Sequence, residues 1–312
     1  MAPFRFGLQL SGATSVEQWR SLARKIEDLG YSTLWVPDHL DEQWAPMVAL
    51  AVAAEATTTL RLGTLVLDND FRHPVILAKE AATMDVVTGG RFEFGLGAGW
   101  LRSDYEQSGI AMEPPAVRIA KLAESLEIMR MLWQEGTATF DGSHYSVSHV
   151  SASPAPITPG GPPIVIGGGS RRILTLAGQF ADTVSIVPSL AAGSIGPEVA
   201  AESVAHKYTE RVRWAKAAAG DRAEQIELQC WTAAVHVSAT ASETASVIES
   251  LGPRLGLTPE QLRAAPIALV GTTSEIIETL KERRETFGFS DIVVHEGELD
   301  ALGPVIARLA GT

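Results

Sequence analysis

The sequence predicts an α/β fold, a (β/α)₈ TIM barrel with insertions after strands 4 and 7. Short runs rich in valine, isoleucine and leucine alternate with amphipathic segments along the whole 312-residue chain. Near-continuous apolar strands separated by helices are typical of a parallel sheet covered on both faces. Eight core strands, each followed by a helix, favour a closed barrel, which typically takes about 250 residues. The alternative is an open doubly wound sheet.

The first third of the chain predicts four strands with helices between them. The strand-like runs lie at 4–10, 32–39, 60–67 and 91–99. Ser15 precedes an amphipathic segment, with Gln18 at the capping-box position and Gly30 after its end, which predicts a helix. A second amphipathic segment covers 45–58. Pro74 suits the first turn of a third helix, which ends at the glycines of 88–90.

The rest of the chain continues the alternation of strands and helices, with two longer insertions. A helix is expected at about 116–135, before a segment rich in Ser, Pro and Gly at 151–163. Further strand-like runs lie at 162–169, 182–189, 226–237, 266–272 and 290–297, which makes nine runs for the eight core strands of the predicted barrel. Helices are expected near 171–179, 197–218 and 273–287. Pro304 opens a terminal helix. No repeat and no charged linker divides residues 1–312, so we expect a single domain.

Composition excludes several classes of function. Hydrophobic residues make up 46% of the chain and charged residues 20%, which fits an enzyme-sized globular protein. A net charge of −12 argues against a nucleic-acid partner or an anionic membrane surface, because both require clustered basic residues. Cys230 is the single cysteine and fits a reducing compartment. With no signal peptide and no long apolar run, we expect a cytoplasmic protein.

The stretch FGLGAGW, residues 94–100, resembles a nucleotide-binding loop. Gly95 and Gly97 match the first two glycines of a dinucleotide fingerprint, but Trp100 takes the place of the third. Its indole would block the close approach of a helix, which argues against that fingerprint. Two interpretations remain. The glycines let a strand pack closely, or the backbone at the strand end faces a ligand.

In a (β/α)₈ barrel the site lies at the C-terminal ends of the strands. That rule selects residues at or near the C-terminal ends of the predicted strands: Gln9, Asp38, His39, Thr64, the 97–100 loop, the glycines at 167–169 and the end of 182–189. Histidine is the side chain best suited to move a proton near neutral pH, and the adjacent Asp38 could hold the charge of His39. Polar residues at these positions can also serve solubility alone.

The stretch IGGGSRR, residues 166–172, combines a strand, three glycines, Ser170 and the start of a helix. Glycines allow a backbone nest, and a helix N-terminus offers free N–H groups, so we expect a phosphate site here rather than a plain tight turn. Arg171 and Arg172 could add positive charge. The histidines are scattered and no H-E-x-x-H motif occurs, so no metal site is expected.

Eight stretches in this order resemble the bacterial luciferase-like monooxygenase superfamily: LWVPDH, LRLGTLVL, FRHP, LAKEAATMDVVTGGR, FGLGAGW, LW at 132–133, PPIVIGGG and VGTTSEI. The likeness covers nearly the whole chain and is closest to the actinobacterial branch that uses coenzyme F420, a deazaflavin. It implies a TIM barrel that binds a flavin or deazaflavin at the C-terminal strand ends. Asp38 and His39 would lie beside the ring, with His39 as proton donor or polarising group.

The resemblance also assigns the remaining cofactor contacts. The Leu65–Val66 peptide would be a non-proline cis bond, which forms a bulge pressed against the ring. The other cofactor-facing positions would be Thr64, Ala98, Gly99, Gly167, Gly168, Gly169 and Ser170. The oligoglutamate tail of F420 requires basic residues at the barrel mouth, and the candidates are Arg171, Arg172, Lys207 and Arg211.

Trp100 is the departure from the family's sugar-phosphate dehydrogenases, which carry a carboxylate just after this glycine. It therefore belongs to the substrate pocket and favours a more apolar, planar substrate. We expect an F420-dependent oxidoreductase that transfers hydride between the deazaflavin C5 and a small organic molecule. The alternatives are an FMN-dependent monooxygenase that uses molecular oxygen, and a non-catalytic cofactor-binding barrel. The resemblance allows a homodimer and implies a separate cofactor reductase.

Overall fold

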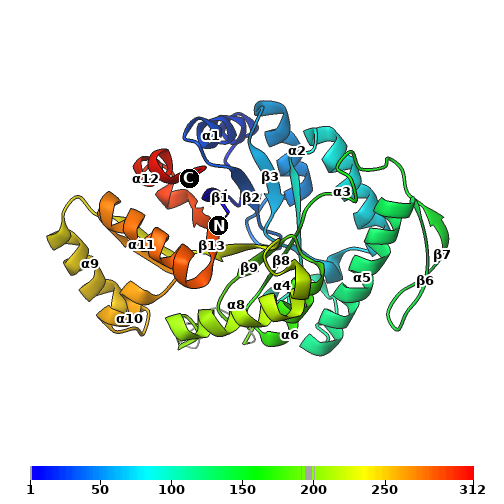
Figure 1. Ribbon diagram of the computed structural model, residues 1–312. Coiled ribbons are helices and arrows are strands. Elements are labelled where there is room, and N and C mark those ends of the chain that lie inside the picture. Colours follow the sequence, from blue (N-terminus) through cyan, green and yellow to red (C-terminus); the bar gives the residue numbers. More distant parts are fainter. Residues whose placement is uncertain (1, 191, 194–198, 200) are drawn as a thin grey trace.

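Eight parallel strands close into a barrel in the computed structural model, which describes residues 2–190, 192–193, 199 and 201–312 (Figure 1). The barrel strands are β1 (Arg5–Gln9), β2 (Thr33–Val36), β3 (Arg61–Thr64), β5 (Phe92–Gly97), β8 (Ile164–Gly168), β9 (Thr183–Ile186), β10 (Glu227–Trp231) and β13 (Phe289–His295). Neighbours along the chain pair in parallel, β13 pairs with β1, and β3 pairs with β5. These last two pairings confirm the closed barrel and exclude the open sheet.

Helices surround the barrel (Figure 1). They are α1 (Val16–Asp28), α2 (Pro46–Ala56), α3 (Pro74–Thr88), α5 (Pro115–Glu135), α6 (Arg171–Phe180), α8 (Ala205–Ala219), α11 (Thr273–Phe287) and α12 (Gly303–Leu309). The short 3₁₀ turns are η1 (Asn69–Phe71), η2 (Gly220–Arg222) and η3 (Glu296–Glu298). Residues 197, 198 and 200 of the helix expected at 197–218 lie outside the described residues. None of the described helices is long and apolar enough to cross a membrane.

Ser15 caps α1 as predicted, because its hydroxyl accepts from the N–H of Gln18 at 3.1 Å. The expected capping box is wrong in its second half. The side-chain oxygen of Gln18 accepts from the N–H of Thr14 at 2.8 Å, one residue before the cap.

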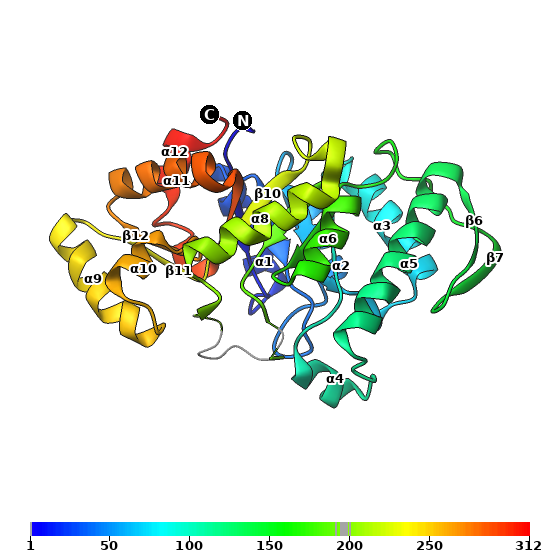
Figure 2. The same ribbon diagram turned by 60° about the horizontal axis from the view of Figure 1, so that its bottom comes forward.

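Two stretches of chain extend beyond the barrel. Between β5 and β8 lie α4 (Arg102–Ser108), α5 and an antiparallel hairpin that the sequence did not predict, β6 (Thr137–Asp141) with β7 (Ser146–Ser151). Between β10 and β13 lie β11 (Ala234–Val237), α9 (Ala241–Arg254), α10 (Pro259–Ala264), β12 (Ala268–Gly271) and α11. Figure 2 shows α4 at the end of the barrel opposite the chain termini, with the hairpin and the α9–α10 unit on opposite flanks.

The predicted strands at 226–237 and 266–272 need correction. The first breaks into β10 and β11, and β12 pairs only with β11 in a separate sheet. The backbone changes partner at the break. Thr232 N–H donates to Val293 O at 3.0 Å within the barrel, whereas Ala233 N–H donates to Ile267 O at 2.8 Å outside it. The apolar run at 266–272 is therefore strand, but it is not a barrel strand.

Charged groups are buried in the barrel interior near the N-terminal strand ends. Arg5 donates to Glu93, and at 2.7 Å to Glu227. Asp291 lies fully buried beside them and accepts from Gln229 Nε2 at 2.7 Å. Burial is the main reason that the pKa of Asp291 rises to about 7, and the nearby carboxylates of Glu227 and Glu93 add to it. One arginine therefore serves several carboxylates.

This cluster predicts that the Asp291→Asn protein depends less on pH for its stability. Between about pH 4 and pH 7 the folded wild type keeps a proton on Asp291 that the unfolded chain has lost. Its free energy of unfolding should therefore fall as pH rises, by up to about 1.4 kcal/mol per pH unit from this group. Asparagine removes the titration of this group and keeps a side-chain oxygen that can accept from Gln229 Nε2. Urea unfolding at pH 5, 6, 7 and 8 checks this, and equal slopes for both proteins would contradict it.

Candidate active site

A cavity of about 840 Å³ opens at the C-terminal ends of the barrel strands. Most of the predicted site residues line it: Asp38, His39, Leu65, Val66, Ala98, Gly99, Trp100, Gly167, Gly168, Gly169 and Ser170. Thr64 is different. It is fully buried, and its hydroxyl donates to Gly95 O at 2.8 Å and accepts from Gly95 N–H at 2.9 Å. Its side chain joins β3 to β5 and does not face the cavity.

His39 pairs with a carboxylate other than the one expected. Its Nδ1 lies 2.7 Å from Oδ2 of Asp104, which is buried on α4 and also accepts from Leu40 N–H at 3.2 Å. Asp38 is engaged elsewhere. It accepts from both terminal nitrogens of Arg72, one of them at 3.0 Å, and from the backbone N–H of Asp68. The expectation that Asp38 holds the charge of His39 is therefore wrong, because Asp38 is already neutralised by Arg72.

Asp104 could not be found from the sequence. It lies 65 residues from His39 in a short charged segment without an apolar stripe. The structure brings the two together because α4 folds back over the end of β2. The His39 ring also meets Trp100 edge to face, with 5.6 Å between ring centroids.

Gly99 has a structural explanation within the protein. Its φ is +71°, and a Cβ there would overlap the Tyr105 hydroxyl and the Asp68 carboxylate. Tyr105 donates to Asp68 at 3.0 Å. Burial raises the pKa of Asp68 to about 6. The glycine is thus needed for the packing of Tyr105, whatever its backbone faces in the cavity.

The Leu65–Val66 peptide bond is cis, as the resemblance implied. The carbonyl of Leu65 accepts from Gln9 Nε2 at 3.3 Å, and Gln9 Oε1 accepts from Trp231 Nε1 at 2.8 Å. Trp231 was not named in the sequence analysis. It ends the seventh barrel strand, but the predicted strand ran on to 237, so the strand-end rule pointed past it.

The glycine loop before α6 differs from the expected nest. None of Gly167, Gly168 and Gly169 has a positive φ, so the loop is not the alternating conformation that forms a nest. A Cβ at Gly168 would overlap Ile173, and one at Gly169 would lie 2.5 Å from the Pro188 carbonyl. These two glycines therefore permit close packing. Ser170 is the N-cap residue, yet no side-chain cap bond forms at this end of α6 in the described structure.

The four basic candidates at the mouth are in different environments. Arg171 and Arg172 are exposed on the first turn of α6, and Lys207 lies 3.7 Å from Glu202. Arg211 is buried and donates to the carbonyl of Gly169 at 3.0 Å and to that of Glu202 at 2.6 Å. Arg211 therefore holds the glycine loop from inside the protein, and its assignment to the solvent-facing mouth is wrong.

Arg118 is the charged cavity residue that the sequence analysis missed. It lies on α5 in the cavity wall, with only 6% of its surface exposed. Its guanidinium stands 5.6 Å from the Tyr105 ring, and its Nε and Nη1 have no hydrogen-bond partner among the described residues. A buried charge without a partner is costly, so this guanidinium indicates a place for an anionic group. Its signal was a basic residue on the buried side of the predicted helix 116–135.

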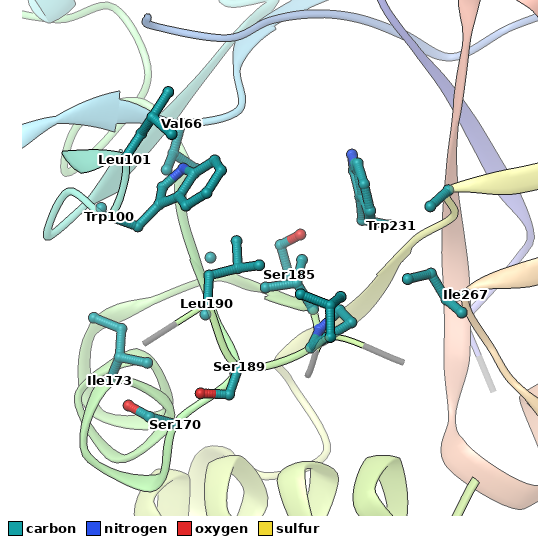
Figure 3. Close-up of a pocket in the computed structure, with 18 of the residues that line it drawn as sticks. Val66, Trp100, Leu101, Ser170, Ile173, Ser185, Ser189, Leu190, Trp231 and Ile267 are labelled. Atoms are coloured by element: carbon teal, nitrogen blue, oxygen red, sulfur yellow. The ribbon is translucent and has the colours of Figure 1, made fainter. Parts of the chain in front are cut away.

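Figure 3 shows the cavity between Val66, Trp100 and Leu101 on one side and Trp231 and Ile267 on the other. Ser170 and Ile173, at the start of α6, lie at a third side. The cavity therefore combines a helix N-terminus, the buried Arg118 guanidinium, the His39–Asp104 pair and two tryptophans. This set can bind an anionic group, move a proton and enclose an apolar molecule.

The chain is similar in sequence to known enzymes. Over 120 residues the chain is 39% identical to 4-hydroxyprotoasukamycin monooxygenase of Streptomyces nodosus subsp. asukaensis, covering 36% of this chain and 32% of that protein. Over 169 residues it is 29% identical to the F420-dependent glucose-6-phosphate dehydrogenase of Amycolatopsis mediterranei, covering 51% and 50%. The chain thus spans half or less of the length of these two curated relatives.

Solved structures share the fold at low identity. The coenzyme F420-dependent tetrahydromethanopterin reductase of Methanopyrus kandleri superposes with a TM-score of 0.76 at 17% identity, covering 99% of both chains. The long-chain alkane monooxygenase LadA gives a TM-score of 0.79 at 14% identity, covering 99% and 91%. The model of the luciferase-like monooxygenase family matches residues 1–290, and the chain belongs to that family.

Proposed function

We propose that the protein is a coenzyme F420-dependent oxidoreductase that transfers hydride between the deazaflavin C5 and a small organic substrate. The observation that carries the proposal is the buried guanidinium of Arg118, whose Nε and Nη1 have no partner among the described residues, in the same cavity as the His39–Asp104 pair. The Arg118 guanidinium can bind an anionic group of a ligand, and the His39–Asp104 pair can move a proton. The F420-dependent relative and the shared fold of the F420-dependent reductase support the choice of cofactor.

The described residues fit a phosphate-bearing, ring-containing cofactor. Arg118 and the uncapped N-terminus of α6 at Ser170 would hold its phosphate. The Leu65–Val66 bulge and the backbone of Ala98 and Gly99 would lie against its ring, since all of them line the cavity. When bound, a deazaflavin supplies hydride-transfer chemistry and activates oxygen poorly.

His39 is the proton-transfer residue of this proposal. The Asp104 carboxylate accepts from Nδ1, so Nε2 is the nitrogen that can gain or release a proton. Asp104 also stabilises the imidazolium and fixes the orientation of the ring, which makes it a positioning residue. Trp100 packs against the histidine and shields it from water on that side.

An FMN-dependent monooxygenase is the second candidate. The relative that is 39% identical bears the name of a monooxygenase, and LadA shares the fold. FMN also carries a phosphate and a tricyclic ring, so Arg118 and the bulge would serve it equally well. A non-catalytic barrel is less well supported, because a purely binding site gives no role to the His39–Asp104 pair in the cavity. We also propose a separate reductase for the cofactor, and a homodimer.

Replacing Arg118 with methionine should weaken F420 binding by about ten- to a hundredfold. Each charge-assisted hydrogen bond to the phosphate contributes about 1.5–3 kcal/mol, and about 1.4 kcal/mol corresponds to a factor of ten. The ring fragment FO lacks the phosphate and should keep its affinity. Fluorescence titration of both ligands measures the contrast. Arg130→Met is the matched control, because Arg130 lies on the same helix but donates to Phe180 O away from the cavity.

Titration with FMN decides between the two candidate functions. Tighter binding of FMN than of F420 to the wild type would contradict the deazaflavin proposal and favour the monooxygenase. Equal loss of F420 and FO in the Arg118→Met protein, with its circular dichroism unchanged, would place Arg118 beside the ring. No loss of either would remove it from the cofactor site.

His39→Ala should lower turnover by about 10²–10⁴-fold and leave F420 affinity nearly unchanged, because a positioned acid contributes that much to rate. Asp104→Asn should lower turnover less. The carboxylate orients the imidazole, which itself remains in the Asp104→Asn protein. Stopped-flow oxidation of reduced F420, with the best acceptor from a panel of enones, quinones and ketones, measures turnover in both variants.

Asp41→Asn is the control for these variants, because Asp41 is exposed in the loop that follows His39. Wild-type turnover in the His39→Ala protein would show that the proton comes from another group. Wild-type turnover in the Asp104→Asn protein would show that the pair with His39 is only structural.

A further inference from the structure

Two tryptophans face the cavity from opposite sides (Figure 3). Trp100 follows β5 and meets the His39 ring at an interplanar angle of 90°. Trp231 ends β10, donates from Nε1 to Gln9 at 2.8 Å, and meets the His295 ring edge to face at 5.0 Å. Each indole is therefore held by a second ring, and Trp231 also by a hydrogen bond. The opening between them has fixed aromatic walls.

The stretch between β10 and β13 forms an apolar wall beside Trp231. Leu255, Leu257 and Ile267 line the cavity from this stretch. Leu257 and Ile267 also belong to a small hydrophobic core, separate from that of the barrel, in which Ile248 and Leu262 are buried. The wall is thus part of a packed unit, so its shape is set before any ligand binds.

The carboxylates that line the cavity already have partners within the protein. Asp38 is paired with Arg72, Asp68 accepts from Tyr105, and Asp104 pairs with His39. Of the lining cations, Arg118 meets the cofactor anion in the proposed function, and Arg254 is exposed at the end of α9. Within the described residues, the tryptophan side of the cavity therefore offers no buried, unpaired charge to a substrate.

We infer that the substrate carries an uncharged, planar, apolar body, an aromatic or conjugated ring system, which binds between Trp100 and Trp231. A charged or polyhydroxylated molecule would lose its hydration there without gaining partners, whereas a flat apolar one stacks on indole faces and displaces water from leucine and isoleucine. The contact between Trp100 and His39 places such a body beside the proton-transfer group. The inference rests on the proposed function for the position of the cofactor.

The test uses menadione, a neutral planar quinone, with the protein loaded with oxidised F420 so that no turnover occurs. Equilibrium dialysis should give micromolar affinity for the wild type and no measurable binding of glucose 6-phosphate. Trp231→Ala should weaken menadione binding about ten- to a hundredfold, because it removes one wall. Trp231→Phe should stay within about threefold of the wild type. F420 affinity should not change in either variant.

Trp214→Ala is the control, because Trp214 lies on α8, half-buried and outside the cavity. Unchanged menadione affinity in a folded Trp231→Ala protein would overturn the inference, as would tighter binding of glucose 6-phosphate than of menadione. Loss of F420 affinity in the Trp231→Ala protein would also overturn the inference, because Trp231 would then contact the cofactor and not the substrate. A wild type that binds menadione without binding F420 would contradict the proposed function and leave the planar site standing.

Discussion

The pairing of β3 with β5 through Thr64 and Gly95 is the constraint on which the mouth of the barrel depends. A side chain at position 95 would overlap the Thr64 carbonyl, so only glycine lets the two strands meet. The Thr64 hydroxyl then bonds both to the N–H and to the carbonyl of Gly95. Immediately beyond this junction lie the Leu65–Val66 bulge on one strand and Gly97–Gly99 on the other, and both line the cavity.

Most charged side chains of the barrel are paired within the protein, so few of them remain to bind a ligand. At the N-terminal end of the barrel, Arg5 donates to the buried Glu93 and the half-buried Glu227, neither of which lines the cavity. At the C-terminal end, most lining charges are paired within the protein, and Arg118 is the buried one whose Nε and Nη1 have no partner among the described residues. Since burial makes an unpaired charge costly, this guanidinium and the free nitrogen of His39 distinguish the cavity from a merely apolar cleft.

In the proposed function, the barrel binds the cofactor, and the stretch between β10 and β13 shapes the substrate pocket. The barrel strand ends supply the bulge, the glycine loop and the histidine, which would serve any member of the family that uses a tricyclic cofactor. The stretch between β10 and β13 supplies the apolar wall and has its own small core. Barrels vary their chemistry through the loops at this face, so differences in substrate are expected to lie there.

The sequence by itself determined the barrel, most helix boundaries and the end of the barrel that holds the site, because apolar periodicity, helix caps and turn glycines act over a few residues. The order of motifs also identified the cis peptide at Leu65–Val66. Only the tertiary structure decided the partners of charged groups. It paired His39 with Asp104 rather than Asp38, buried Arg211 under the glycine loop, and placed Arg118 in the cavity wall with its Nε and Nη1 unpaired among the described residues. It also moved β12 out of the barrel. Such contacts join segments tens of residues apart, and they depend on how helices and loops pack over the strand ends, which local patterns do not encode.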